Sequence, residues 1–512
     1  MMKLALAQIN TTVGDLAGNV ARILDAASSV ANQKPDLIIF PEMTISGYPP
    51  RDILYDASFI EAVQAATKDL VNRSKGLPPM LVGSFEPSGE NLLEHPALHN
   101  IAYLIHSGEK RIAQVKQLLP VYDVFLEPRW FIPGKKTLPP IEIAGHKVGI
   151  LICEDMWDEQ YPVHPGADLR RIGAEVLICM SAAPYEKGSM ENRLYHARRQ
   201  SLPIAFVDLV GGNDELIFDG CSFVLDGAGE MLHSSPRFRE DVSVVDFPGV
   251  ERMPSNLQCH EEEVFDALVL GLHDFFFKNR QKRIVVGLSG GVDSSLAAVI
   301  AAKAVGAGNV LGVAIPSRYT DRRSIESARE LAENLGIEFE VVELEKIHSI
   351  AEQVIGPDRS AGIGGENIQA RLRMIILMSY VNQVNGMLLN TSNKTELTLG
   401  YSTLYGDMAG AISPLGDLTK PEVYALARWV NEVENSIPSF VMERKPSAEL
   451  KPNQADPFDY EKLSPELEQL VCSSRSNAAM RASEHKRWQM GVVLKVSAKS
   501  FGSGRLVPIT RK

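Results

Sequence analysis

One short segment carries a pattern that suits phosphate binding. Ser289-Gly290-Gly291-Val292-Asp293-Ser294 lies between a β-branched apolar run at 284–286, which predicts a buried strand, and a segment rich in Ala and Val at 296–305, which predicts a helix. Glycines let backbone N–H groups approach an anion, and a helix N-terminus adds partial positive charge. Because no Lys follows at the Walker A spacing, the segment predicts a different kind of phosphate-binding turn.

Three reactive side chains follow apolar runs in the first half of the chain. They are Glu42, Lys116 and Cys153. A cysteine nucleophile needs a base to accept its proton and a positive charge beside the substrate's oxyanion. If the three side chains converge, Glu42 supplies the base and Lys116 the cation. Each residue alone is more typical of a cap, a surface charge or a small core residue, so the hypothesis depends on the three together.

These residues and their neighbours resemble the Glu-Lys-Cys triad of the nitrilase superfamily. The matching segments are Phe40-Pro41-Glu42 with Gly47-Tyr48-Pro49, Lys116-Gln117-Leu118-Leu119-Pro120, Cys153-Glu154-Asp155, and Val124 to Arg129, which is similar to the family's accessory-glutamate segment. The resemblance covers residues 3–247 and implies an αββα sandwich that hydrolyses a carbon–nitrogen bond through a thioester. For the glutaminases of this superfamily, it also implies that Tyr122, Ser181 and Lys187 bind glutamine.

The second half alternates strands and helices at a spacing typical of a doubly wound parallel sheet. We expect strands over 284–288, 310–315, 338–342 and 387–390, with the ligand at their carboxyl ends. A helix is expected to open at Glu366. Asp293 and Glu396 could supply oxygen ligands to Mg²⁺, which binds through one or two carboxylates plus substrate phosphates.

The glycine-rich segment also resembles the pyrophosphate loop of the N-type ATP pyrophosphatases, which activate a substrate carbonyl by adenylylation. With the segments 366–373, 389–396, 405–407, 413–420, 444–450 and 483–487, the second half resembles the glutamine-dependent NAD⁺ synthetases. That resemblance implies ATP contacts at Leu288, Ser289, Gly290, Gly291, Val292, Asp293, Ser294, Ser295 and Thr391, and deamido-NAD⁺ contacts at Asn367, Glu396 and Lys486. After Asp456 the chain departs from the family's Pro-Pro-Tyr pattern, so no site residue is assigned over 441–460.

Together the two resemblances imply a bifunctional amidotransferase. It would hydrolyse glutamine to glutamate and ammonia, adenylylate deamido-NAD⁺ with ATP, and amidate it in the final step of NAD⁺ biosynthesis, with Mg²⁺ as cofactor. We expect a glutaminase domain over 1–250, a linker over 251–260 and a synthetase domain over 261–512. The family resemblance also implies a homo-oligomer.

Composition narrows the choice of partners and compartment. The 512 residues carry a net charge of −12, which argues against nucleic acid or an anionic membrane surface as a partner. The sequence has no apolar stretch long enough for a membrane span. Its five widely scattered cysteines argue against a disulfide framework, so a reducing cytoplasm is expected.

Three alternatives remain open from the sequence. Another glutamine-dependent adenylating ligase, such as one making GMP or asparagine, would share the glycine-rich segment, but such ligases use other glutaminase folds. A plain carbon–nitrogen hydrolase with a degenerate nucleotide domain is disfavoured by the intact segment 289–294 and by 391–396. A nucleotide-sensing module without glutamine turnover would leave the Glu-Lys-Cys set without a purpose.

Overall fold

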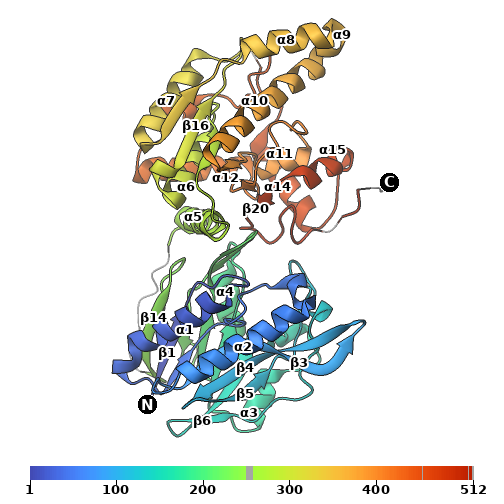
Figure 1. The fold of residues 1–512 in the computed structure, drawn as a ribbon. Helices are drawn as coiled ribbons and strands as arrows, with labels where there is room; N and C mark the ends of the chain where they lie inside the picture. The colour runs from blue at the N-terminus through green and yellow to red at the C-terminus, as the bar shows by residue number, and fades with distance from the viewer. Residues whose placement is uncertain (250–257, 453, 506, 510–512) are drawn as a thin grey trace. The chain divides into compact units, whose positions relative to one another are not determined.

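The computed structural model describes residues 1–249, 258–452, 454–505 and 507–509. The chain forms two compact units (Figure 1). One comprises Met1–Asn213 and Ile217–Leu257, and the other comprises Asp214–Leu216 and Gln258–Lys512. Most of the linker expected over 251–260 lies outside the described residues, and helix α5 begins at His260. None of the helices in the described ranges combines the length and apolar character that a membrane span requires.

The first unit is built on two six-stranded sheets and a separate hairpin of strands β10 and β11. One sheet has the order β14-β1-β2-β3-β4-β5 and the other β13-β12-β9-β8-β7-β6. The strands of the first sheet are β1 (Met2–Gln8), β2 (Leu37–Ile39), β3 (Met80–Leu92), β4 (His95–His106), β5 (Glu109–Val115) and β14 (Asp241–Phe247). Those of the second sheet and the hairpin are β6 (Ile141–Ile143), β7 (His146–Ile152), β8 (Val176–Ser181), β9 (Ile204–Asp208), β10 (Val210–Asn213), β11 (Leu216–Asp219), β12 (Phe223–Leu225) and β13 (Met231–Ser234).

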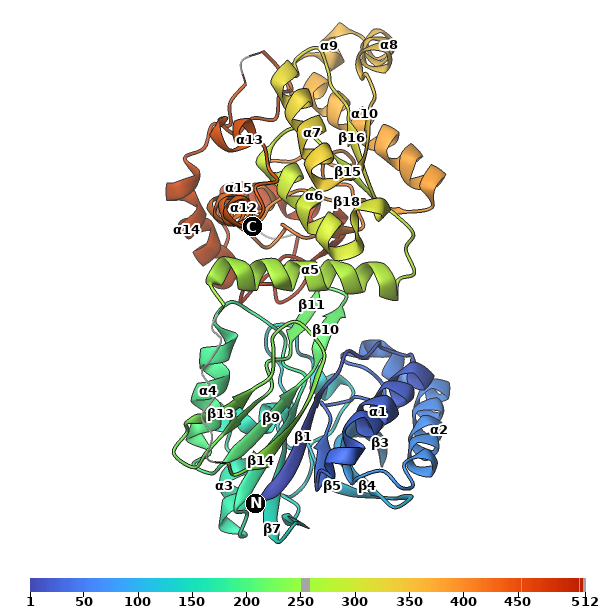
Figure 2. The same cartoon turned by 90° about the vertical axis from the view of Figure 1, so that its left-hand side faces the viewer.

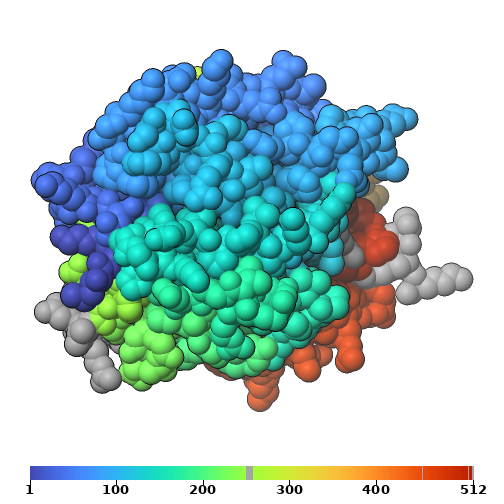
Figure 3. All heavy atoms as spheres, turned by 90° about the horizontal axis from the view of Figure 1, so that it is seen from below, coloured from blue at the N-terminus to red at the C-terminus, as the bar shows by residue number. Residues whose placement is uncertain are grey.

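Apolar side chains from both sheets meet in one core. Leu4 and Ile39 from the first sheet are fully buried in the same cluster as Val148 and Ile178 from the second. Helices α1 (Leu16–Val30) and α2 (Ala57–Arg73) cover the first sheet, and α3 (Pro165–Arg171) and α4 (Ser189–Arg199) cover the second (Figure 2). The expected αββα sandwich is therefore confirmed. Seen from below, blue to green atoms of this unit form a continuous face (Figure 3).

The second unit is organised on one parallel sheet with the order β17-β16-β15-β18-β19-β20. Its strands are β15 (Ile284–Gly287), β16 (Val310–Ala314), β17 (Glu338–Val341), β18 (Met387–Leu389), β19 (Ile412–Ser413) and β20 (Val492–Val493). The helices are α5 (His260–Lys278), α6 (Val292–Val305), α7 (Arg322–Leu335), α8 (Glu345–Ile355), α9 (Pro357–Ser360), α10 (Gly362–Val384), α11 (Lys394–Leu399), α12 (Lys420–Val433), α13 (Ser439–Glu443), α14 (Tyr460–Cys472) and α15 (Ala478–Ser483). The expected parallel α/β architecture is confirmed.

Two helices of this unit begin earlier than the sequence indicates. Helix α6 begins at Val292 rather than at Leu296, because Asp293 and two serines occupy its first turn, where an acidic side chain favours the helix dipole. Helix α10 begins at Gly362 rather than at Glu366. The earlier start of α6 places the phosphate-binding pattern directly on a helix N-terminus.

Candidate active sites

The first candidate site gathers three side chains that directly follow strands. Glu42 lies just beyond β2, Lys116 directly after β5, and Cys153 directly after β7. Cys153 has a φ of 45°, in the left-handed region that residues other than glycine rarely adopt. Such strained backbone is found at sites where the surrounding structure must hold a reactive group in one orientation.

A buried lysine links two buried carboxylates at this site. Lys116 Nζ lies 2.8 Å from Glu42 Oε1 and 2.8 Å from Glu127 Oε1. The side chains of Lys116 and Glu42 are fully buried, and that of Glu127 is 4% exposed. Asn100 Nδ2 donates to Glu42 at 2.6 Å, and the Tyr48 hydroxyl donates to Glu127 at 3.2 Å. Glu127 therefore lies beside the lysine, as its motif indicates.

Burial and charge set the protonation of this cluster. Burial by itself disfavours a charged lysine, but Glu127 and Glu42 outweigh it and hold the pKa of Lys116 above its ordinary value. Burial raises the pKa of Glu127 to about 7, although Lys116 opposes the shift. Burial and then the charge of Glu42 raise the pKa of the Cys153 thiol well above its ordinary value. The thiol is therefore protonated at neutral pH, and a base must remove its proton.

Glu42 has the geometry of such a base. Its Oε2 is buried and has no hydrogen-bond partner among the described residues, whereas its backbone N–H donates to the carbonyl of Ser181 at 3.3 Å. Strand β3 packs closely against the turn that carries Glu42. A Cβ at Gly83 would lie 2.4 Å from Met43 N and 2.5 Å from Pro41 O, so only glycine fits there.

Asp155 is a structural element of the site to which the sequence assigned no role. Its Oδ1 accepts the N–H groups of Gln117 and Leu118, both at 2.9 Å, and its Oδ2 accepts the N–H of Ile152 at 3.2 Å. One carboxylate thus ties the backbone after Lys116 to the strand that ends at the nucleophile. Burial raises the pKa of Asp155 to about 7. Only its position two residues after the cysteine in the motif could have suggested this role.

The expected glutamine-binding residues lie on three segments. Ser181, at the end of β8, donates its hydroxyl to the nucleophile's Sγ at 3.5 Å. The hydroxyls of Tyr122 and Tyr161 both donate to the buried carboxylate of Glu154, each at 2.9 Å. Lys187 is half-buried just before α4. Glu154, which the sequence reasoning left without a role, thus lies next to the nucleophile and holds the tyrosine expected to bind substrate.

The second candidate site is a cavity of about 310 Å³ at the carboxyl ends of β15, β16 and β18. The expected ATP-binding residues that line it are Leu288, Ser289, Gly291, Val292, Asp293, Ser294 and Thr391. Gly290 has a φ of 74°, and a Cβ there would lie 2.3 Å from the carbonyl oxygen of Ser324. The turn therefore requires glycine at this position, with α6 directly after it.

The carboxylates of Asp293 and Glu396 in this cavity lie near the side-chain ammonium of Lys420. Lys420 Nζ lies 2.5 Å from Asp293 Oδ2 and 3.6 Å from Glu396 Oε1. Burial, followed by the charge of Asp293, raises the pKa of Glu396 to about 8, against the pull of Lys420. In the described ranges, no three His, Cys, Asp or Glu side chains cluster to hold a metal. Two carboxylates still fit Mg²⁺, which takes its other ligands from water and phosphates.

Other expected residues lie outside the cavity wall among the residues described. Gly290 and Ser295 are not on its lining, and Ser295 Oγ instead donates to Gly291 O at 2.9 Å. Asn367 and Lys486 also do not line it. Asn367 accepts a hydrogen bond from Thr403 at 2.7 Å, and Lys486 donates to the carbonyls of residues 400 and 402 at 2.8 and 2.6 Å.

The cavity wall includes residues that the sequence reasoning left without a role. They are Asp407, Lys420, Arg444, Glu449 and Asp456. Arg444 Nη1 donates to Ser324 Oγ at 2.7 Å, and Nη2 lies 3.1 Å from the carboxylate of Glu449. No site residue was assigned over 441–460 because the family pattern breaks there, yet this segment contributes directly to the wall.

Known proteins of one family contain both of the domains that carry these two sites. The model of carbon-nitrogen hydrolases matches residues 3–252, and the model of NAD synthases matches residues 264–499. The chain is 36% identical over 552 residues to the glutamine-dependent NAD(+) synthetase of Synechocystis sp., with 100% of this chain and 99% of that protein covered. The chain belongs to the glutamine-dependent NAD(+) synthetases.

Further relatives agree with this family membership. The enzyme of the same name from Thermotoga maritima is 34% identical over 583 residues, covering 100% of this chain and 99% of that protein. The structure of glutamine-dependent NAD⁺ synthetase from Acinetobacter baumannii in complex with ADP matches with a TM-score of 0.80 and 31% identity, over 99% of this chain and 98% of that one. Members of this family are ligases, so the chain is an enzyme of that type.

Proposed function

We propose that the chain makes NAD⁺ from deamido-NAD⁺ and ATP with nitrogen taken from glutamine, and that the Glu42–Lys116–Cys153 cluster releases the nitrogen. The observation that carries the proposal is the buried Glu42 carboxylate, which has one oxygen on Lys116 and the other free of hydrogen bonds among the described residues. We assign residues 1–250 to the glutaminase, 251–260 to a linker and 261–512 to the synthetase.

In the first reaction Glu42 accepts the proton of the Cys153 thiol, and the sulfur attacks the side-chain amide of glutamine. Lys116 stabilises the oxyanion of the tetrahedral intermediate, ammonia leaves, and water hydrolyses the thioester to glutamate. Tyr122, Ser181 and Lys187 bind the substrate. Ser181 is well placed for this because its hydroxyl already contacts the sulfur.

In the second reaction the nicotinate carboxylate of deamido-NAD⁺ attacks the α-phosphorus of ATP. The backbone of 288–295 and Thr391 bind ATP, while Asn367, Glu396 and Lys486 bind deamido-NAD⁺. Pyrophosphate leaves, and ammonia then displaces AMP from the acyl adenylate. Asp293 and Glu396 would hold Mg²⁺, which neutralises phosphate charge.

We also propose that the chain forms a homo-oligomer and is located in the cytoplasm. Apolar side chains on α8 and α10 support assembly, since Ile350, Val354 and Ile363 are 61%, 80% and 76% exposed. Sedimentation velocity of Val354→Glu against wild type tests this proposal. An unchanged sedimentation coefficient would remove these helices as the contact.

The decisive assay incubates the purified chain with ATP, Mg²⁺, deamido-NAD⁺ and either glutamine or ammonium, and follows NAD⁺ and AMP. We expect NAD⁺ from both nitrogen sources. Cys153→Ala should lose only the glutamine-dependent part, and Cys259→Ala, at an exposed cysteine, should lose neither. Glutamate release without NAD⁺ or AMP would overturn the synthetase proposal.

A further inference from the structure

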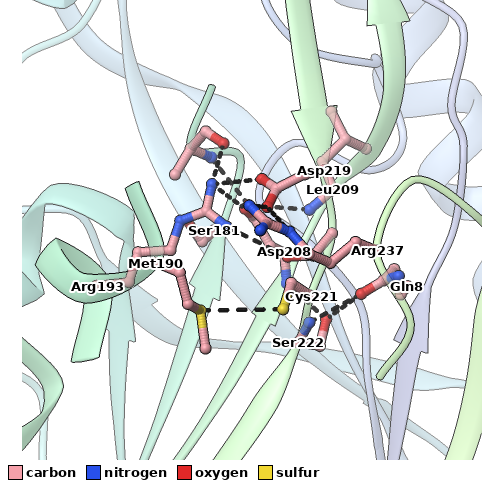
Figure 4. Close-up of polar contacts among 12 residues, drawn as sticks. Gln8, Ser181, Met190, Arg193, Asp208, Leu209, Asp219, Cys221, Ser222 and Arg237 are labelled. Carbon is pink, nitrogen blue, oxygen red and sulfur yellow. Dashed lines mark hydrogen bonds and ion pairs between the residues drawn. The ribbon is translucent and has the colours of Figure 1, made fainter. Parts of the chain in front are cut away.

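A second buried cluster of charges lies in the first unit, and the mechanism above does not use it. Arg193 on α4 places Nη2 2.7 Å from Asp219 and 3.2 Å from Asp208, and Arg237 lies 2.9 Å from Asp219 (Figure 4). The side chains of the first three are at most 1% exposed, and that of Arg237 is 11% exposed. Two arginines and two aspartates thus lie together in a largely buried cluster.

This cluster holds the residue Ala183 by both of its backbone polar groups. Asp208 Oδ1 accepts the N–H of Ala183 at 2.9 Å, and Arg193 Nη2 donates to the carbonyl of Ala183 at 3.0 Å. Asp208 Oδ1 also accepts the N–H of Leu209 at 3.0 Å. Figure 4 shows the guanidinium of Arg193 lying between Ser181, Asp208 and Asp219. Hydrogen bonds on both sides hold the backbone at Ala183 in one position.

Ala183 lies two residues after Ser181, whose hydroxyl contacts the reacting sulfur. Ser181 donates its hydroxyl to Cys153 Sγ at 3.5 Å, and its carbonyl accepts the N–H groups of Glu42 at 3.3 Å and Leu209 at 3.2 Å. The segment 181–183 therefore contacts the nucleophile, the backbone of the base and the buried charges. A shift of this segment would move the sulfur's hydrogen-bond partner and the base together.

We propose that Arg193 and Asp208 are positioning residues for glutamine hydrolysis, which set the place of segment 181–183 against Cys153 and Glu42. The inference rests on the proposed glutaminase role of Cys153. It assigns the effect of Asp208 to its two backbone contacts, both accepted by Oδ1, so an amide at this position should serve nearly as well. Burial raises the pKa of Asp208 to about 7, in keeping with tolerance of a neutral side chain there.

The test compares Asp208→Ala, which removes both contacts, with Asp208→Asn, which keeps an oxygen acceptor. A misplacement of about 1 Å at a reacting group costs about 10²-fold in rate, so Asp208→Ala should lower kcat for glutamine by about that factor. Asp208→Asn should restore most of the rate, and both should keep ammonium-dependent NAD⁺ formation. Arg199→Ala is the matched control, because Arg199 lies on the same helix in an exposed pair with Glu159.

Alkylation of the Cys153 thiol by iodoacetamide, followed against pH, gives a readout that needs no glutamine. Asp208→Ala should change this profile and Asp208→Asn should preserve it. Equal rates in Asp208→Ala and wild type would overturn the proposal, and so would an equal loss in the Ala and Asn variants. If Asp208→Ala does not fold, Arg193→Lys against Asp208→Asn decides. We expect the lysine variant to lose rate, because an ammonium does not reproduce the planar guanidinium geometry that places Nη2 on both the carbonyl of Ala183 and Asp219.

Two outcomes separate this proposal from the one on which it rests. If wild type releases no glutamate, the glutaminase proposal fails, and the alkylation profile still reports on positioning. If wild type is active and the Asp208 variants match it in both readouts, only the positioning proposal fails.

Discussion

Replacing Lys116 by methionine tests the first site most sharply, because it keeps length and apolar volume while removing one charge. Lys116 is the shared partner of the two buried carboxylates, Glu42 and Glu127, both at 2.8 Å. Without it, two carboxylates face each other in a water-free site. Breaking a buried ion pair by removing one partner costs about 3–5 kcal/mol. If Lys116 stabilises the oxyanion as proposed, its loss should also lower glutamine turnover by about 10²–10³-fold.

Hydrogen exchange of β4 and β5 in the full chain measures the stability change, and glutamate release measures the rate. Lys110→Met is the control, because Lys110 forms an exposed pair with Glu86 and its loss should cost at most about 1 kcal/mol. Adding Glu127→Gln to Lys116→Met should recover part of the stability and none of the activity. The reasoning is refuted if Lys116→Met keeps glutamine turnover within about threefold of wild type, since that leaves less than a kcal/mol of stabilisation to explain.

Three further changes probe other parts of the argument. Asp155 has a pKa of about 7 in the folded chain against an ordinary value of 3.8, so between these pH values the folded chain binds a proton that the unfolded chain does not, and the free energy of unfolding falls as pH rises. Asp155→Asn should reduce the slope of the free energy of unfolding against pH by up to about 1.4 kcal/mol per pH unit. Urea unfolding at several pH values measures this slope. Gly290→Ala should lower ammonium-dependent NAD⁺ formation by about 10-fold or more, because its Cβ would meet Ser324 at a positive φ, and Gly291→Ala, where the nearest side-chain atom lies at 3.3 Å, should lose less. Lys420→Met should increase the thermal stabilisation by Mg²⁺, because the lysine no longer competes for the same carboxylates; an unchanged shift would remove these carboxylates as the metal site.

The positions of the main side chains could be predicted because each follows a recognisable apolar run. The runs that end before Glu42 and Cys153 became β2 and β7, and the glycine-rich segment lies between β15 and α6. Periodicity could not place the half-buried strand β14, which pairs with β1 although more than 230 residues separate Gln8 from Asp241 in sequence. The start of α6 was misplaced because small polar residues are as typical of turns as of a first helical turn.

The remaining site residues depend on contacts between distant parts of the chain. Lys420 meets Asp293 across 127 positions, and nothing in its local sequence indicates the pairing. Arg193 and Asp208 are buried, although arginine and aspartate usually lie at the protein surface, so their residue types did not indicate this role. The segment 441–460 was left without a role because a family pattern breaks there, but backbone packing brings it to the cavity regardless.

Lys116 is surrounded by more carboxylates than its single positive charge can neutralise, and this affects release of the product after glutamine hydrolysis. Glutamine brings a neutral amide into the site, and the reaction leaves a carboxylate in the same place. One ammonium is shared by Glu42 and Glu127, and Glu154 adds a third acidic group beside the nucleophile. Because like charges repel strongly in a buried site, we expect these carboxylates to favour release of the glutamate product, and inhibition by glutamate should be weak.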